Sequence, residues 1–191
     1  DNLVSRALYL SRAFTPDVAY VNGLSIVFEG GGIESDGQGT LLTTDSVVVE
    51  PNRNAGVDEE VLRTHLMEIL GGKRLLSLEN GELEGDDTDG HIDTLARFIT
   101  PEMIAYVGCD DERDSHYHAL RRMREELENF RTLEDKPYQL VELPLPPAIY
   151  DEEGERLPAT YANFLFVNGA LLVPTYGVPS DEVALERLRK A

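Results

Sequence analysis

The chain has 191 residues, enough to bury a sizeable hydrophobic core in one large domain or two small ones. Its formal net charge of −19 and sequence pI near 4.4 repel nucleic-acid phosphate and anionic membranes, which excludes these partners and favours a cationic ligand. The single cysteine, Cys109, excludes an internal disulfide and a thiolate zinc cluster, and no segment has the apolar length of a membrane span.

Hydrophobic spacing predicts a first group of elements within residues 1–78. The Asn22-Gly23 dipeptide favours a type I′ hairpin turn, and Gly71-Gly72 is typical of the end of a helix. The predicted elements are a helix at Asp1–Phe14, a hairpin at Val18–Phe28, strands at Thr40–Thr44 and Val47–Glu50, a helix at Val57–Leu70 and a strand at Arg74–Leu78.

The same order then returns twice. The later elements are strands at Asp93–Ile99 and Met103–Gly108, a helix at Asp114–Phe130, strands at Tyr138–Leu143, Tyr161–Val167 and Ala170–Val173, and a helix at Asp181–Lys190 with Ser180 as its N-cap. Hairpins start at Thr40, Asp93 and Tyr161, which are 53 and 68 residues apart. A β-β-α unit therefore recurs, with a further strand after the first two helices, and this pattern predicts an array of repeats within a single α/β domain at 1–191.

The stretch Gly85–Asp93, GDDTDGHID, concentrates titratable residues between glycines. If the element is extended, the spacing of His91 and Asp93 places both side chains on one face, the arrangement that proton transfer needs. A charge run alone is more often a solvated acidic turn, and that interpretation stays open here.

A second stretch, FEGGGIESDGQGT, strengthens the functional interpretation. Glu29 follows an apolar strand and precedes three glycines, which allow a ligand to approach the backbone closely. A carboxylate there suits a positively charged substrate, because burial without a cation would raise its pKa. Equivalent strand ends of successive repeats often line one opening, so we expect Glu29, His91 and Asp93 to converge.

Three segments carry a family resemblance: EGGGIESDGQGTLLTTDSVVVEPNRN, GDDTDGHIDTLARF and TYANFLFVNGALLVPTYG. Together they resemble the agmatine deiminase family of the guanidine-modifying, or pentein, superfamily. The resemblance implies a five-bladed α/β propeller of ββαβ units around a central site. It also implies a cytoplasmic hydrolase of arginine and polyamine metabolism that needs no cofactor.

The resemblance also implies roles for individual residues. Glu29 would bind the guanidinium of a small cationic substrate, His91 would act as general acid/base, and Asp93 would hold the other guanidinium nitrogens. Asp87 would shape the site or meet the far amine of the substrate. In the family a cysteine thiolate attacks the guanidinium carbon, ammonia leaves, and water releases the carbamoyl product from the amidino-cysteine.

The chain departs from the family pattern at both ends. In the family the cysteine lies in a Gly-Gly-x-x-x-His-Cys segment, and a further guanidinium-binding Asp lies in a Trp-x-x-Asp motif. Neither motif occurs in this sequence. Cys109 precedes Asp110 and Asp111 and is interpreted as a structural thiol. We therefore expect about three of five blades, without the first and last, and open repeat ends that are compatible with a homo-oligomer.

Two other interpretations stay open. The first is a metal-dependent hydrolase with Asp86, Asp87, Asp89, His91 and Asp93 as ligands, although a helix-loop-helix calcium loop would place Gly85 and Ala96 at ligand positions. The second is a non-catalytic module that binds a cationic guanidine. On the arginine-rich helix, His116 and His118 are interpreted as parts of a solvated face.

Overall fold

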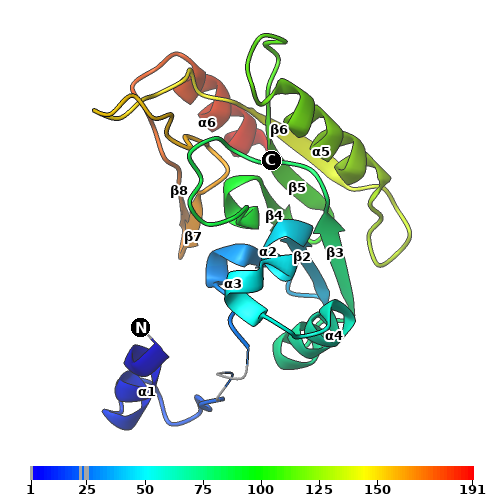
Figure 1. Cartoon of the computed structure of the whole chain (residues 1–191), viewed down its shortest axis with the longest axis vertical. Helices are drawn as coiled ribbons and strands as arrows, with labels where there is room; N and C mark the ends of the chain where they lie inside the picture. Colours follow the sequence, from blue (N-terminus) through cyan, green and yellow to red (C-terminus); the bar gives the residue numbers. More distant parts are fainter. Residues whose placement is uncertain (1, 22, 24–25) are drawn as a thin grey trace.

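The computed structural model describes residues 2–21, 23 and 26–191 and shows a mixed α/β fold with three small sheets (Figure 1). No helix in this part of the chain is long and apolar enough to cross a membrane. In chain order the elements are α1 (Asn2–Leu10), η1 (Gly30–Gly32), β1 (Ile33–Ser35), β2 (Thr40–Thr44), α2 (Asp45–Val49), α3 (Pro51–Asn54), α4 (Glu59–Leu70), β3 (Arg74–Leu78), η2 (Ile92–Thr94), β4 (Ala96–Thr100), β5 (Met103–Gly108), α5 (Tyr117–Asn129), β6 (Gln139–Pro144), β7 (Leu165–Val167), β8 (Ala170–Leu172) and α6 (Ser180–Lys190).

Two three-stranded sheets share one topology. Their orders are β1-β2-β3 and β4-β5-β6, and in each sheet the first pair is antiparallel and the second parallel. A parallel pair needs a crossover, which α4 provides in the first sheet and α5 in the second. The third sheet pairs β7 with β8, and α6 follows it. The order ββαβ therefore recurs in the first two units as expected, but in the first unit the strand that pairs with β2 is β1, which is not among the strands predicted from the sequence.

The predicted strand at Val47–Glu50 is wrong, because this segment belongs to helix α2. The Thr44 side chain caps the helix by accepting a hydrogen bond from the Val47 N–H at 3.3 Å, and Asp45 places a negative charge in the first turn. Val47 and Val48 are buried. Capping and tertiary burial thus override the strand preference of a β-branched run.

Some other boundaries also differ from the prediction. Residues before β4 form the short 3₁₀ turn η2 instead of extending the strand, and β7 starts only at Leu165. Ser180 lies inside α6, and the residue at the N-cap position is Pro179. The Asn22 half of the predicted hairpin turn lies outside the described residues, and the described neighbours at 18–21 and 26–28 form no strand.

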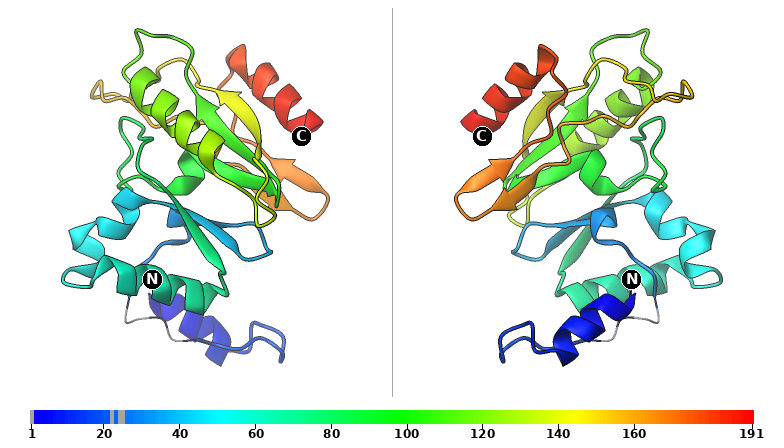
Figure 2. Two further views of the ribbon diagram at one scale, coloured as in Figure 1. Left: turned by 90° about the vertical axis from the view of Figure 1, so that its right-hand side faces the viewer. Right: turned by 90° about the vertical axis from the view of Figure 1, so that its left-hand side faces the viewer.

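The main hydrophobic core lies where the first two sheets meet α5. Leu42 and Leu78 from the first sheet pack with Ile104 and Tyr106 from the second, and Met123 of α5 lies in the same cluster. A second cluster fixes α6 against the second sheet, and α1 lies at one end of the molecule, away from the sheets (Figures 1 and 2). This core holds the starts of the two ββαβ units side by side.

The expected solvated position of His116 is wrong. Only 5% of its side chain is exposed; its Nδ1 lies 2.8 Å from Asp114 Oδ1, and its Nε2 accepts the Glu84 N–H at 2.7 Å. Asp114 in turn pairs with Arg156 at 2.8 Å. This network fixes Glu84, the residue just before the Gly85–Asp93 loop. His116 can be buried because its hydrogen bonds compensate the cost of removing the imidazole from water.

Candidate active site

The candidate site lies where η1 and η2 meet, just before the first strand of each ββαβ unit. Gly31 of η1 packs so closely on the second unit that an added Cβ would lie 2.5 Å from His91 Nδ1 and 2.8 Å from Asp93 Oδ2. The structure therefore brings both motifs together, as the repeat argument predicts. Glycine is required at this contact because any larger residue would displace the imidazole or the carboxylate.

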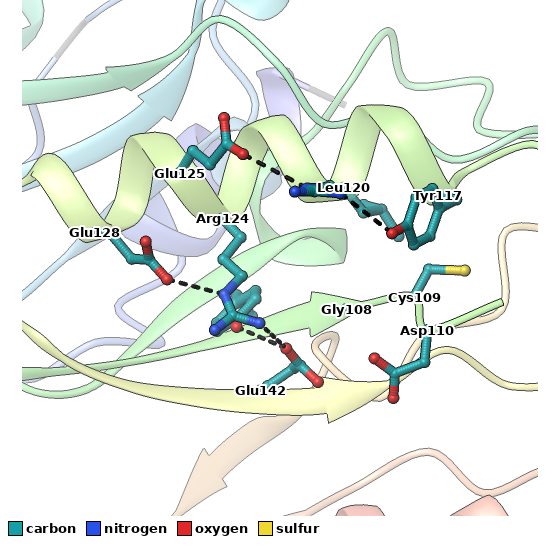
Figure 3. Close-up of a pocket in the computed structure, with 11 residues that line it drawn as sticks. Gly108, Cys109, Asp110, Tyr117, Leu120, Arg124, Glu125, Glu128 and Glu142 are labelled. Atoms are coloured by element: carbon teal, nitrogen blue, oxygen red, sulfur yellow. Dashed lines mark hydrogen bonds and ion pairs between the residues drawn. The ribbon is translucent and has the colours of Figure 1, made fainter. Parts of the chain in front are cut away.

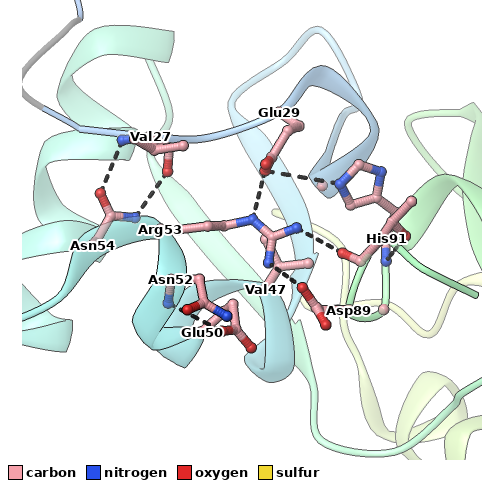
Figure 4. A network of polar contacts seen from close by, with 12 residues as sticks. Val27, Glu29, Val47, Glu50, Asn52, Arg53, Asn54, Asp89 and His91 are labelled. Atoms are coloured by element: carbon pink, nitrogen blue, oxygen red, sulfur yellow. Dashed lines mark hydrogen bonds and ion pairs between the residues drawn. The ribbon is translucent and has the colours of Figure 1, made fainter.

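Glu29 stands at the entrance to η1, and its side chain is 43% exposed. Its Oε2 accepts a hydrogen bond from Arg53 Nε at 2.7 Å and lies 3.8 Å from His91 Nε2 (Figure 4). The second distance is within reach of an ion pair but too long for a hydrogen bond. Glu29 is therefore fixed by one cation while its carboxylate faces the imidazole.

His91 is largely buried, with 14% of its side chain exposed. Its Nε2 is inaccessible to solvent and has no hydrogen-bond partner among the described residues. Buried polar atoms normally have a partner, and exceptions are common at functional sites. The imidazole lies close to both carboxylates, because its Nε2 is 3.8 Å from Glu29 Oε2 and it packs together with Asp93 against Gly31.

The loop that carries His91 is organised by its own side chains. Asp86 Oδ1 accepts the Thr88 N–H at 3.0 Å, and Asp86 Oδ2 accepts the Gly90 N–H at 3.1 Å. The Gly90 carbonyl accepts the Thr44 hydroxyl at 2.7 Å, which ties the loop to the end of β2. Asp86 thus acts within the loop, and no set of three His, Cys, Asp or Glu residues in the described part of the chain is placed to hold a metal ion.

The two carboxylates of the site lie in different electrostatic environments. Burial works to raise the pKa of Glu29, but the hydrogen bond and the charge of Arg53, together with His91, outweigh it and lower the pKa. Burial raises the pKa of Asp93, and the charges of His91 and Arg97 offset this effect only in part. Glu29 is therefore the more firmly ionised of the pair.

Asp87 and Cys109 lie apart from this cluster. Asp87 is exposed, and its side chain makes no hydrogen bond or ion pair with any of the described residues. Cys109 lines a separate cavity beside α5, of about 360 Å³, together with Arg124 and Glu142 (Figure 3). Burial raises the pKa of the Cys109 thiol, and the charges of three nearby aspartates add to this effect. Such a thiol is a poor nucleophile at neutral pH.

Arg53 is the member of the site that sequence reasoning missed. The sequence predicts no element at Pro51–Asn54, but this segment forms α3 and presents Arg53 to Glu29 and to the loop. A signal exists in the composition: between residues 13 and 72, Arg53 and Arg63 are the only Lys or Arg residues. One of the few cations between two acidic motifs is a natural partner for one of them.

Known proteins resemble the whole chain. The model of the Porphyromonas-type peptidyl-arginine deiminase family matches residues 1–191. A Porphyromonas gingivalis protein provisionally named an arginine deiminase is 51% identical, with a TM-score of 0.96 over 98% of this chain and 55% of that one. The C. jejuni agmatine deiminase, solved as a cysteine-to-serine variant with substrate bound, is 42% identical, with a TM-score of 0.85 over 97% of this chain and 53% of that one.

A curated relative from Marinomonas sp. (strain MWYL1), provisionally named an agmatine deiminase, is 32% identical over 207 residues. The match covers 100% of this chain and 54% of the relative. The chain thus spans about half the length of the proteins that it resembles.

Proposed function

The chain belongs to the Porphyromonas-type peptidyl-arginine deiminase family, and we propose that the protein hydrolyses the guanidinium group of agmatine or a related arginine-type compound. The products are ammonia and the carbamoyl compound. The relatives are named agmatine or arginine deiminases, which supports this reaction class. The proposal assigns to residues 1–191 the part of the site that binds and protonates the substrate.

The buried, unpartnered Nε2 of His91 is the observation that carries this proposal. A guanidinium is a planar cation with several N–H donors, and it needs carboxylates around it. Glu29 and Asp93 both lie near the imidazole and provide that charge. In this role Glu29 and Asp93 bind the substrate nitrogens, while His91 faces the nitrogen that leaves. Asp87, exposed on the same loop, is proposed to meet the far amine.

The reaction needs a nucleophile. A cysteine sulfur forms a bond to the guanidinium carbon, the adduct loses one nitrogen, and His91 supplies the proton with which that nitrogen leaves as ammonia. His91 then takes a proton from water, whose oxygen bonds to the same carbon, and the C–S bond breaks. The environment of Cys109 opposes this role, so we assign the nucleophile to a cysteine outside residues 1–191. The crystallisation of the C. jejuni enzyme with substrate as a cysteine-to-serine variant is consistent with such a residue.

The repeated topology supports a matching proposal for the fold. Two complete ββαβ units and the following β7-β8-α6 unit are three consecutive units of one design. We propose that they are three of five blades of one propeller domain. In such a ring the first strands of neighbouring blades would line the centre, and Glu29 and His91, which precede β1 and β4, would face it.

The test measures ammonia release and carbamoyl product with agmatine, free arginine and a peptide ending in arginine, using the complete gene product. Glu29→Gln and His91→Asn should each abolish measurable turnover, because the first removes a substrate anchor and the second the proton carrier. Cys109→Ser is the matched control and should keep turnover near the wild-type rate. Full activity in Glu29→Gln would exclude the proposed site. Agmatine binding without turnover would indicate a non-catalytic guanidine-binding module.

A further inference from the structure

Arg53 joins the two segments that carry the candidate site. Its Nε donates to Glu29 Oε2 at 2.7 Å, one terminal nitrogen donates to the Thr88 carbonyl at 2.7 Å, and the other lies 3.3 Å from Asp89 Oδ2 (Figure 4). Only 8% of the Arg53 side chain is exposed. One buried guanidinium thus bridges the residue before η1 and the loop before η2. A planar fork with fixed donors suits such a bridge better than any other side chain.

The helical turn that carries Arg53 is itself fixed to the segment before η1. Asn54, the next residue, accepts the Val27 N–H at 2.9 Å and donates to the Val27 carbonyl at 2.8 Å. Two adjacent residues of α3 therefore hold residues 27 and 29 from the same side. The Glu50 side chain caps α3 by accepting the Asn52 N–H at 3.0 Å, which stabilises this short turn.

The contacts of Glu29 engage only one of its two carboxylate oxygens. Arg53 and His91 both approach Oε2 of Glu29, so Oε1 lies outside these two contacts. Neither His91 nor Asp93 donates to or accepts from the Arg53 guanidinium among the contacts of the described residues. Arg53 thus neutralises part of the charge of Glu29 and leaves the imidazole and the Asp93 carboxylate without a contact to its guanidinium.

We propose that Arg53 is a positioning residue, which holds the Glu29 carboxylate and the Thr88–Asp89 backbone in the arrangement that receives a ligand guanidinium beside His91. The inference rests on the proposed function, because it assigns no ligand of its own. Arg53 acts through Glu29 and the loop and does not contact the substrate. Without Arg53, Glu29 would lose its cationic partner, and the loop would lose its hydrogen bonds to the guanidinium.

The variants separate this role from general stability. Arg53→Met removes the fork, and Arg53→Lys keeps a charge that cannot bridge the three acceptors at once. The matched control is Arg63→Met, because Arg63 also pairs with two carboxylates, Asp45 and Glu59, but contacts neither motif. All variants are made in the complete gene product. Agmatine affinity is measured by calorimetry across a pH series, with circular dichroism to establish folding.

We expect Arg53→Met to weaken agmatine binding by about tenfold or more, Arg53→Lys by less, and Arg63→Met by less than about twofold. The dependence of agmatine affinity on pH distinguishes the two roles, because a merely structural role of Arg53 would not change it. Loss of the Arg53 cation should shift the acidic limb of binding to higher pH, because Glu29 then protonates more readily. The same shift, smaller, is expected in Arg53→Lys, which keeps the measurement possible if Arg53→Met does not fold.

The outcomes distinguish the two proposals. If wild-type protein binds none of agmatine, free arginine and a peptide ending in arginine, the proposed function fails and this inference fails with it. If wild-type protein binds agmatine but both Arg53 variants keep its affinity and pH profile, the positioning role alone is overturned. An equal loss in the Arg53 variants and in Arg63→Met would also overturn it, since the effect would then be a general one.

Discussion

At the scale of single residues, the site holds one carboxylate that is easily kept ionised and one that is not. The pKa of Glu29 is lowered by Arg53 in spite of burial, whereas burial raises the pKa of Asp93. A guanidinium keeps its charge throughout the working pH range, so its binding depends on how many carboxylates are ionised. Acidification should therefore neutralise Asp93 first and Glu29 later, and agmatine affinity should fall in that order.

The raised pKa of Asp93 also predicts an effect on stability. Between the pKa of the unfolded chain, near 3.8, and the higher pKa of the folded chain, the folded state binds more protons. The free energy of unfolding contributed by Asp93 therefore falls as pH rises through this window, and the cost is complete at neutral pH. Asp93→Asn should unfold at an equal or higher urea concentration than wild type at neutral pH, although it loses agmatine binding. The difference in urea midpoint between Asp93→Asn and wild type should shrink as pH falls through this window. A large loss of stability in Asp93→Asn at neutral pH would contradict the expected cost of ionised Asp93.

Gly31 is a second residue whose effect can be predicted. A methyl group at this position would lie 2.5 Å from His91 Nδ1 and 2.8 Å from Asp93 Oδ2, so one of these groups must move. Gly31→Ala should weaken agmatine binding by about tenfold or more and shift the imidazole NMR signals of His91. Gly30→Ala is the control in the same turn, because its added methyl meets no atom within 4 Å. Equal effects of the two variants would show that chain flexibility, and not the contact, is responsible.

At the scale of elements, the sequence predicts those whose periodicity and caps agree. β2, β3 and β5 have the predicted bounds, and α4 begins at Glu59 after its cap Asp58 and ends before Gly71. The β-branched run in α2 misled the prediction because its helix depends on the Thr44 cap and on burial of Val47. The contact of η1 with η2 followed from the repeat, but Arg53 did not, because a one-turn helix has no periodicity to detect.

The Glu34–Arg97 pair connects the first strand of one sheet with the first strand of the next. Arg97 lies 2.6 Å from Glu34 Oε1, donates to the Phe164 carbonyl, and stacks over the Phe164 ring at 5.1 Å. The side chains are only 18% and 11% exposed. Burial raises the pKa of Glu34 even though Arg97 works to lower it. One buried arginine thus links β1, β4 and the residues that precede β7.

Removing Arg97 should therefore be costly. Arg97→Met leaves a buried carboxylate unpaired and should lower the free energy of unfolding by about 3–5 kcal/mol at neutral pH. The double variant Glu34→Gln/Arg97→Met should recover part of this loss, because no buried charge remains, and the cost of the single variant should shrink at acidic pH as Glu34 becomes neutral. Arg124→Met, whose arginine is 52% exposed, is the control and should cost less than about 1 kcal/mol. Urea unfolding of wild type, Glu34→Gln, Arg97→Met and the double variant gives the coupling energy, and a value near zero would contradict this role.

At the scale of the whole molecule, the repeat could be predicted from the sequence because each unit uses the same order of elements with its own turn residues. Asn168-Gly169 joins β7 to β8 as predicted, with Gly169 at φ 82°, although Asn168 does not have the positive φ that a type I′ turn requires. The spacing of the units does not reveal how their sheets pack. That packing depends on Leu42, Leu78 and their partners in the second sheet, which are distant in sequence. Long-range packing of this kind leaves no local pattern in a single sequence.

The net charge of −19 predicts that added salt stabilises the folded chain but weakens the binding of agmatine. Raising the concentration of NaCl from about 0.01 M to about 1 M shortens the Debye length from about 30 Å to about 3 Å. Repulsion among the carboxylates of the folded chain is then screened, so the urea midpoint should rise. The attraction between the acidic protein and cationic agmatine is screened as well, so the dissociation constant should increase. Urea must be the denaturant, because guanidinium chloride is a salt and carries the group that Glu29 is proposed to bind. Agmatine affinity that is independent of salt would argue that shape, and not charge, selects the ligand.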